Sequence, residues 1–252
     1  MFELNQETIR PLISEFLDIY KNSPIKSNNG GMKTPHAFWT WYTLKQIKPD
    51  IIIESGIWKG FSTWLIEQAC PSAKVYSIDI NLNFRSYISD KVLYSTTDFN
   101  EENWTDILGQ ENCKNTLVFF DDHQSAFERL QHCHKHGIGH VIFEDNYPTQ
   151  HGDCLSLKKI FMNNYHIEDK MNQRISKQIP PHYKEIVQQI CRHFEFPPIY
   201  LDSNTTRWGD SFDDHQCAPP IFKTIDELGE TNKLLCDEQL YYTFILYAKM
   251  IL

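Results

Sequence analysis

Apolar runs and helical patterns alternate along the first 150 residues of the chain. The run 51–53 consists of three isoleucines without a polar interruption, which predicts a strand buried on both faces. Further strands are predicted at 74–79, 91–95, 115–121 and 140–144, with helices between them, most clearly at 104–108 and 125–136. Strands that alternate with helices indicate a parallel sheet with helices on both faces.

The two flanks of this region have a different pattern. Apolar residues at helical spacing predict helices at 6–20 and 36–47 before the first strand. After Pro148 the alternation lapses, and we expect helices at 154–163 and 181–193, a polar loop at 170–180, and the last two strands at 198–201 and 241–250. The segment 202–235 is rich in polar and turn residues, which predicts a long ordered loop or a mobile lid.

The first predicted strand ends in a turn that contains two glycines. Glu54 ends the strand, Gly56 and Gly60 lie in the turn, and Ser62 falls where the next helix begins. Glycine lets the backbone turn sharply and approach a ligand closely, and the start of a helix offers free N–H groups. The spacing matches neither Gly-x-Gly-x-x-Gly nor a phosphate loop, and a purely structural turn would carry the same glycines.

The second predicted strand ends in Asp79. An acid at this point binds the ribose hydroxyls in nucleotide-binding folds, and ligands in open parallel sheets bind outside the carboxyl ends of the strands. Strand, glycine turn, helix, strand and acid therefore predict one ligand-binding unit.

Two further strand ends carry clusters of polar residues. The fourth strand is followed by Asp121-Asp122-His123, and the fifth by Glu144-Asp145-Asn146. Converging carboxylates repel one another unless a cation neutralises them, and oxygen ligands favour magnesium, calcium or manganese. Capping of the next helix explains any one of these acids equally well, but it explains a double cluster poorly. The sequence therefore favours a metal site.

The glycine turn resembles the first motif of class I S-adenosylmethionine-dependent methyltransferases, with Trp58 where that family usually has its middle glycine. This form of the motif, 54–60, is similar to that of metal-dependent sugar O-methyltransferases of macrolide and aminocoumarin biosynthesis. The acid clusters also resemble those of the catechol and caffeoyl O-methyltransferases. The resemblance covers residues 50–150 and fades beyond them.

The resemblance implies a Rossmann-like, doubly wound α/β fold. Its mostly parallel seven-stranded sheet would have one antiparallel strand, with N-terminal helices and a substrate cover added. One domain is expected over 1–252, with an N-terminal helical segment at 1–48, a cofactor-binding half at 49–147, and the substrate cover and last strands at 148–252.

The resemblance also implies ligands and site residues. S-adenosyl-L-methionine would be bound by Glu54, Gly56, Trp58, Gly60, Ser62, Asp79, Asp98 and Phe99. A divalent cation, Mg²⁺ or Mn²⁺, would be held by Asp121, Asp145, and Asn146 or Glu144, although Asp122 competes with Asp121 for that place. His123 or Asp122 would be the general base, and for His123 capping of the helix or contact with the cofactor remain alternatives.

Charge and composition exclude several classes of partner. The net charge of -9 argues against nucleic acid, which needs a basic surface. The N-terminus has no apolar core of a secretory signal, and the apolar end 241–252 is too short to span a bilayer. Seven cysteines without a Cys-x-x-Cys pair indicate reduced thiols, so we expect a cytoplasmic protein. Whether it forms a homo-oligomer is left open.

We therefore expect an enzyme, a metal-dependent O-methyltransferase whose acceptor is a small molecule or glycan. A sugar hydroxyl with a vicinal oxygen is favoured by the form of the glycine motif, and by Tyr165, His166, Arg207, Trp208, Asp210 and His215 in the cover. A catechol-type acceptor and a non-catalytic nucleotide-binding module are the alternatives. Zinc binding by the histidines of 132–140 is disfavoured, because cations are favoured at the end of a helix anyway and no cysteine pair completes the set.

Overall fold

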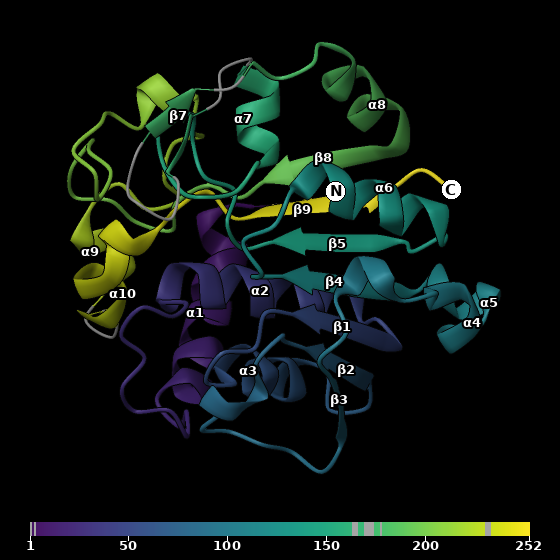
Figure 1. Ribbon diagram of the computed structural model, residues 1–252. Helices are drawn as coiled ribbons and strands as arrows, with labels where there is room; N and C mark the ends of the chain where they lie inside the picture. The colour runs from purple at the N-terminus through teal and green to yellow at the C-terminus, as the bar shows by residue number, and fades with distance from the viewer. Residues whose placement is uncertain (1, 3, 163–165, 169–173, 177, 230–232) are drawn as a thin grey trace.

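The computed structural model describes residues 2, 4–162, 166–168, 174–176, 178–229 and 233–252. Its centre is a seven-stranded sheet in the order β3-β2-β1-β4-β5-β9-β8, with helices on both faces (Figure 1). The strands are β1 Ile51–Ser55, β2 Lys74–Ile78, β3 Val92–Ser95, β4 Thr116–Phe120, β5 His140–Phe143, β8 Cys191–Glu195 and β9 Leu246–Met250. In this sheet β9 alone runs against the other strands, since it is antiparallel to both β5 and β8. The predicted Rossmann-like fold with one antiparallel strand is confirmed.

The helices divide between the two faces of the sheet. They are α1 Gln6–Tyr20, α2 Thr34–Ile47, α3 Phe61–Ala69, α4 Trp104–Leu108, α5 Gln110–Cys113, α6 Ala126–Lys135, α7 Leu157–Met162, α8 His182–Ile190, α9 Ile225–Leu228 and α10 Lys233–Glu238. Ile52 of β1 packs with apolar side chains of α1, α2 and α3. Ile51 and Ile53 face the other way and pack with those of α6 and α8. Burial on both faces explains why the strands are continuous apolar runs.

The predicted N-terminal helices are present, and local signals set their ends. Asn5 caps α1, since its side chain accepts a hydrogen bond from the N–H of Thr8, whose hydroxyl reaches back to Asn5. The helix α2 ends at Lys48, which adopts a left-handed conformation directly before Pro49.

The segments after Pro148 differ most from the sequence predictions. The strand expected at 198–201 is wrong, because the edge strand is β8, which pairs over five residues with β9. The helix expected at 181–193 is accordingly shorter and ends at Ile190. Within the polar loop expected at 170–180, β7 (Arg174–Ser176) pairs with β6 (His166–Glu168) in a two-stranded sheet.

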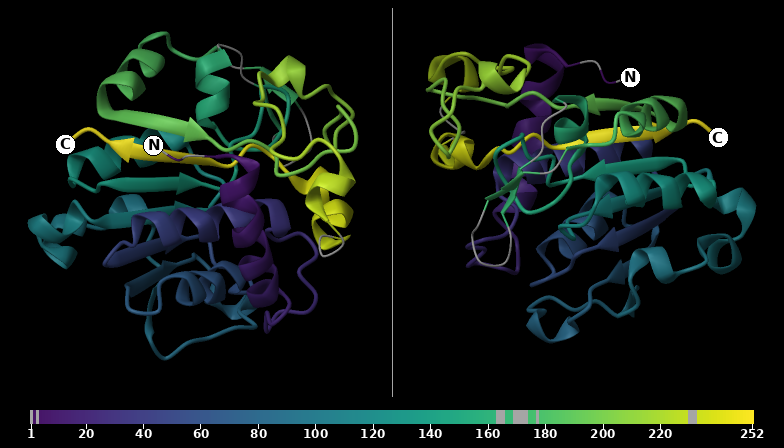
Figure 2. Two further views of the ribbon diagram at one scale, coloured as in Figure 1. Left: turned by 180° about the vertical axis from the view of Figure 1, so that it is seen from behind. Right: turned by 45° about the horizontal axis from the view of Figure 1, so that its top comes forward.

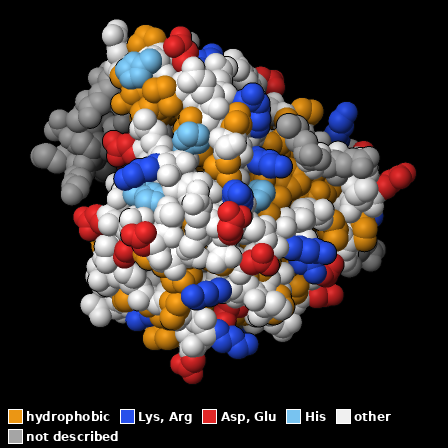
Figure 3. Space-filling view, turned by 90° about the vertical axis from the view of Figure 1, so that its right-hand side faces the viewer, with side chains coloured by type: hydrophobic (Ala, Val, Ile, Leu, Met, Phe, Trp, Pro, Cys, Tyr) orange, Lys and Arg blue, Asp and Glu red, His pale blue; other side chains and the backbone are white. Residues whose placement is uncertain are grey.

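Of the segments after Pro148, α9 and α10 lie on the side of the sheet to which the parallel strands point, whereas α8 lies beside the edge strand β8 (Figures 1 and 2). The opposite end of the molecule shows Lys, Arg, Asp and Glu side chains interspersed with several histidines (Figure 3). No helix in the described part of the chain is long and apolar enough to cross a bilayer. All seven cysteines are free thiols.

Candidate active site

A cavity of about 440 Å³ lies at the carboxyl ends of the parallel strands. Nine of the predicted site residues line it, namely Gly56, Trp58, Asp79, Asp98, Asp121, Asp122, His123, Glu144 and Asp145. Arg129 of α6 and three residues of the flanking segments, Tyr147, Arg207 and Tyr241, line it as well. The structure therefore brings the predicted cofactor half and the predicted metal cluster to one cavity.

The glycine turn packs directly against the end of β4. Gly56 has a φ of +97°, and a Cβ atom there would lie 2.0 Å from the carbonyl oxygen of Asp121, so only glycine fits. Gly60 has a φ of +88° and precedes α3. Trp58 is also left-handed, with a φ of 45°, and its side chain is 39% exposed at the cavity. For a bulky residue this backbone conformation is a strained one.

Asp79 holds this turn in place. Its Oδ2 accepts hydrogen bonds from the backbone N–H groups of Ile57 and Trp58, both at 2.9 Å, and its Oδ1 accepts one from Asn81. The next residue, Ile80, lines the cavity with 83% of its surface exposed. An exposed apolar side chain beside a carboxylate suits a ligand with a flat apolar ring and hydroxyl groups. Ile80 was not among the predicted site residues, although it directly follows Asp79 in the sequence.

Glu54 lies behind the turn and does not line the cavity. It is completely buried, and its Oε2 accepts hydrogen bonds from Thr63 (2.6 Å) and Ser77 (2.5 Å). Burial raises the pKa of this carboxyl to about 7. In this arrangement Glu54 joins β1, β2 and α3, and its predicted contact with a cofactor stays a prediction.

Three other predicted cofactor residues also lie outside the cavity lining. Gly60 and Ser62 form the start of α3. Phe99 is fully buried, and its ring packs on Trp104 and Phe120. These three residues lie outside the lining of this cavity, and their predicted contact with a cofactor stays a prediction.

Arg129 joins the two halves of the site. Its guanidinium makes two parallel hydrogen bonds to Asp98, of 2.7 and 2.8 Å, and its Nε donates to Asp122 at 3.0 Å. Only 3% of the Arg129 side chain is exposed. The arginine holds the pKa of the Asp98 carboxyl below its usual value. Arg129 was not among the predicted site residues. In the sequence it lies three residues after Ala126 and next to Leu130, on the buried face of α6, and a charged residue on such a face indicates a buried ion pair.

The acid cluster centres on Asp121, His123 and Asp145, whose ligand atoms all lie within 4.8 Å of one another. Burial and repulsion by Glu144 and Asp145 raise the pKa of Asp121 well above its ordinary value. The Oδ2 atom of Asp145 is buried and has no hydrogen-bond partner among the described residues. Asp122 instead accepts a hydrogen bond from Ser55 and pairs with Arg129. Of the two neighbouring aspartates, Asp121 is therefore the one that faces the cluster.

His123 lies between carboxylates on both sides. Its Nδ1 is 2.8 Å from Asp153, and its Nε2 is 3.4 Å from Asp145. The hydrogen bond to Asp153 is the main cause that raises the pKa of His123 to about 10. A charged imidazole cannot accept a proton, and Asp122 is held by Arg129. The structure therefore presents neither predicted base as a free one.

The two residues that flank Asp145 in sequence face different partners. Glu144 lines the cavity and hydrogen-bonds to the buried His36 of α2. Asn146 turns away, since its amide donates to Glu195 and its Oδ1 accepts from the backbone N–H of Lys158. The predicted contribution of Asn146 to the metal cluster is thus not met in this geometry, because both of its polar ends are engaged elsewhere.

The cover residues that we expected to contact a sugar are separated. Arg207 lines the cavity, but Trp208 stacks on His151 at a ring distance of 4.2 Å. Asp210 and His215 belong to a second cluster, described below. Tyr165 lies outside the described residues, as does the side chain of His166.

Of the comparisons with known proteins, only the one with solved structures gave matches. No protein-family model matches the chain, and no curated protein sequence matches it. Among solved structures, "cmcI-D160 Mg-SAM" is 19% identical over 50% of this chain and 64% of that one, with a TM-score of 0.36. The S-adenosylhomocysteine-bound Podospora anserina methyltransferase PaMTH1 is 13% identical over 57% and 71%, with a TM-score of 0.39. Cofactor-bound Rv0187 from MTB is 11% identical over 95% and 89%, with a TM-score of 0.43.

Three forms of CmcI are matched over 57, 64 and 66% of their own length, so this chain spans less than two thirds of each of them. The sheet order, the single reversed strand and the glycine turn after β1 define a Rossmann-like fold.

Proposed function

We propose that this protein is an S-adenosylmethionine-dependent O-methyltransferase that uses a divalent cation. One observation carries the proposal: a single cavity is lined both by the glycine turn with Asp79 and by the cluster of Asp121, Glu144 and Asp145. A bound methyl donor and a bound acceptor would meet in this cavity.

The donor end fits an adenosyl cofactor. Asp79 offers a carboxylate beside the exposed Ile80, and the turn at Gly56 brings the backbone close to the cavity. S-adenosylmethionine supplies a methyl group on a sulfonium, which needs no further activation. The task left to the protein is to align the acceptor oxygen and to help it lose its proton.

The acid end fits a divalent cation. Among the described residues, the buried Oδ2 of Asp145 has no hydrogen bond and only the 3.4 Å ion pair with His123, and Asp121 and Glu144 repel it. A cation there would lower the pKa of an acceptor hydroxyl. Asp121 and Asp145 would hold it, with oxygen donors that suit Mg²⁺ or Mn²⁺. The competing explanation is that the proton on His123 alone neutralises the cluster.

The acceptor that we favour is a sugar or glycan hydroxyl with a vicinal oxygen. Two adjacent oxygens can chelate a metal, and both vicinal sugar diols and catechols offer them. The sugar is supported by the form of the turn motif with Trp58, and by Tyr147 and Arg207 at the acid end of the cavity. A panel of glycosides, catechols and caffeoyl esters decides between them. Catechol turnover without any glycoside product would contradict the sugar assignment and leave the metal mechanism standing.

One observation favours a second candidate, a nucleotide-binding module without methyl transfer. Neither His123 nor Asp122 is free to act as a base. Calorimetric titration with S-adenosylhomocysteine, NAD and nucleotide sugars separates the candidates. We expect S-adenosylhomocysteine to bind and the others not to bind. Tighter binding of NAD or of a nucleotide sugar would contradict the methyltransferase proposal.

A further inference from the structure

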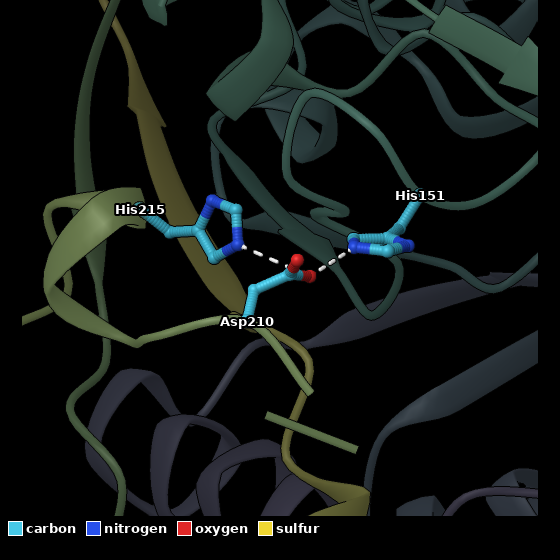
Figure 4. Close-up of side chains that lie close together, drawn as sticks. All are labelled: His151, Asp210 and His215. Carbon is cyan, nitrogen blue, oxygen red and sulfur yellow. Dashed lines mark hydrogen bonds and ion pairs between the residues drawn. The ribbon is translucent and has the colours of Figure 1, made fainter. Parts of the chain in front are cut away.

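A second group of potential metal ligands lies in the cover, apart from the acid cluster. Figure 4 shows that His151 and His215 approach the carboxylate of Asp210 from opposite sides. Oδ2 of Asp210 pairs with Nε2 of His151 and lies 3.7 Å from Nε2 of His215. One nitrogen from each histidine and one carboxylate oxygen lie within 4.8 Å of one another.

The burial of His215 is the observation that points to a ligand. Its side chain is only 8% exposed, yet neither ring nitrogen has a hydrogen-bond partner among the described residues. An unsatisfied buried polar group costs free energy, so native structures rarely keep one without a bound partner.

An ordinary ion pair does not account for the whole group. His151 and Asp210 pair directly, and the ring of Trp208 stacks on His151. This explains those two residues, but among the described residues it leaves His215 with only the 3.7 Å contact of Nε2 to Asp210 and no partner for Nδ1. The nearby Lys158 is paired with Glu195 at 2.7 Å, so it does not use the Asp210 charge.

We propose that His151, Asp210 and His215 bind a divalent transition-metal ion, with zinc as the expected one. Imidazole nitrogens favour zinc over magnesium, and two histidines with one carboxylate form a known zinc ligand set. Three protein ligands leave a further coordination position for water. This site is separate from the oxygen-rich cluster at Asp121 and Asp145, and it does not depend on the proposed methyl transfer.

The ion would fasten two distant segments of the cover. His151 follows β5, whereas Asp210 and His215 belong to the segment between β8 and α9. Trp208, which stacks on His151, also contacts the ring of Tyr147, and Tyr147 and Arg207 line the active-site cavity. Zinc would therefore hold the cover in the position that forms one wall of the cavity.

The test is a zinc titration of the metal-stripped full-length chain against a competing chelator, with Mg²⁺ in excess. We expect one tightly bound zinc per chain. His215→Gln and Asp210→Asn should each weaken zinc binding at least about tenfold, the loss that even an outer partner of a ligand can cause. Asp145→Ala and the control His193→Gln, which removes a neighbouring histidine outside the group, should bind zinc like the wild type.

Co²⁺ substitution gives a readout that needs no variant. The wild type should show the visible absorption of Co²⁺ in a nitrogen and oxygen site, and zinc should displace it. Wild-type protein that takes up no zinc under excess Mg²⁺ would overturn the proposal. Unchanged zinc affinity in a folded His215→Gln variant would do the same, as would loss of the zinc in Asp145→Ala.

Discussion

Nδ1 of His36 lies 2.6 Å from Oε1 of Glu144, although 108 positions separate the two residues in the chain. The backbone N–H of Thr243 donates to Nε2 of the same ring at 2.8 Å. The proton of the imidazole is therefore on Nδ1, which donates to Glu144. Burial lowers the pKa of His36 to about 3, so the ring is neutral. A neutral histidine thus ties α2 and the segment before β9 to the acid cluster.

Replacing His36 should destabilise the protein. His36→Ala leaves the Thr243 N–H and the Glu144 carboxyl without partners in a buried place, which should lower the free energy of unfolding by about 2 to 4 kcal/mol. Urea denaturation measures the change. The matched control is His134→Ala on the exposed side of α6, where the change should stay within about 0.5 kcal/mol. Equal effects of the two substitutions would contradict the role of His36.

Asp79 should affect cofactor binding through both charge and turn geometry. Asp79→Ala removes the acceptor for Ile57 and Trp58 and the carboxylate in the cavity, and should weaken S-adenosylhomocysteine binding by about 1.5 to 3 kcal/mol. Asp79→Asn keeps an oxygen acceptor for the turn, so it should lose less. Calorimetry measures both. Unchanged affinity in Asp79→Ala would contradict the assignment of Asp79 to the cofactor site. The assignment of the fold would still stand.

Chelation should abolish activity and spare cofactor binding. In the proposed mechanism the acid cluster would serve the acceptor, whereas the turn and Asp79 would serve the cofactor, so EDTA should stop methyl transfer while S-adenosylhomocysteine still binds. Mg²⁺ or Mn²⁺ should restore activity. Asp145→Ala should lower kcat at least about 100-fold, because a metal supplies several kcal/mol of charge stabilisation. Full turnover in excess EDTA would show that the cluster is structural.

Glu54 should make stability depend on pH. Its folded-state pKa of about 7 lies above the ordinary value of 4.5, so between these values the folded protein holds a proton that the unfolded chain releases. The free energy of unfolding should therefore fall as pH rises from about 5 to about 7, by roughly 3 kcal/mol from this group. Glu54→Gln keeps an acceptor for Thr63 and Ser77 and removes this contribution. Urea denaturation at about pH 5 and about pH 8 should show a smaller difference in the variant; an identical difference would contradict the prediction.

Arg129 should be important for stability. Arg129→Met leaves Asp98 and Asp122 facing each other without their shared cation, which should cost about 3 kcal/mol. Lys135→Met, an exposed change on the same helix, is the control and should cost less than about 0.5 kcal/mol. Equal denaturation midpoints for the two variants would show that the arginine contributes no more than a surface charge.

The sequence by itself determined the sheet and the edge that carries the site. Unbroken apolar runs such as 51–53 identify strands buried on both faces, and the carboxyl ends of parallel strands meet at one edge. The glycine turn, Asp79 and the two acid clusters were therefore predictable as neighbours, because their places follow from where each strand ends.

Only the tertiary structure decided which side chains face the cavity. Asp121 faces the acid cluster and Asp122 faces Arg129, a choice that neighbouring identical residues cannot show in sequence. The last edge strand lies at 191–195, which carries Arg192, His193 and Glu195, and not at the more apolar 198–201, because pairing with β9 selects the edge strand. His36 reaches Glu144 across 108 positions. Local sequence patterns predict the type and the ends of helices and strands. Contacts between residues far apart in the sequence depend on how these elements pack.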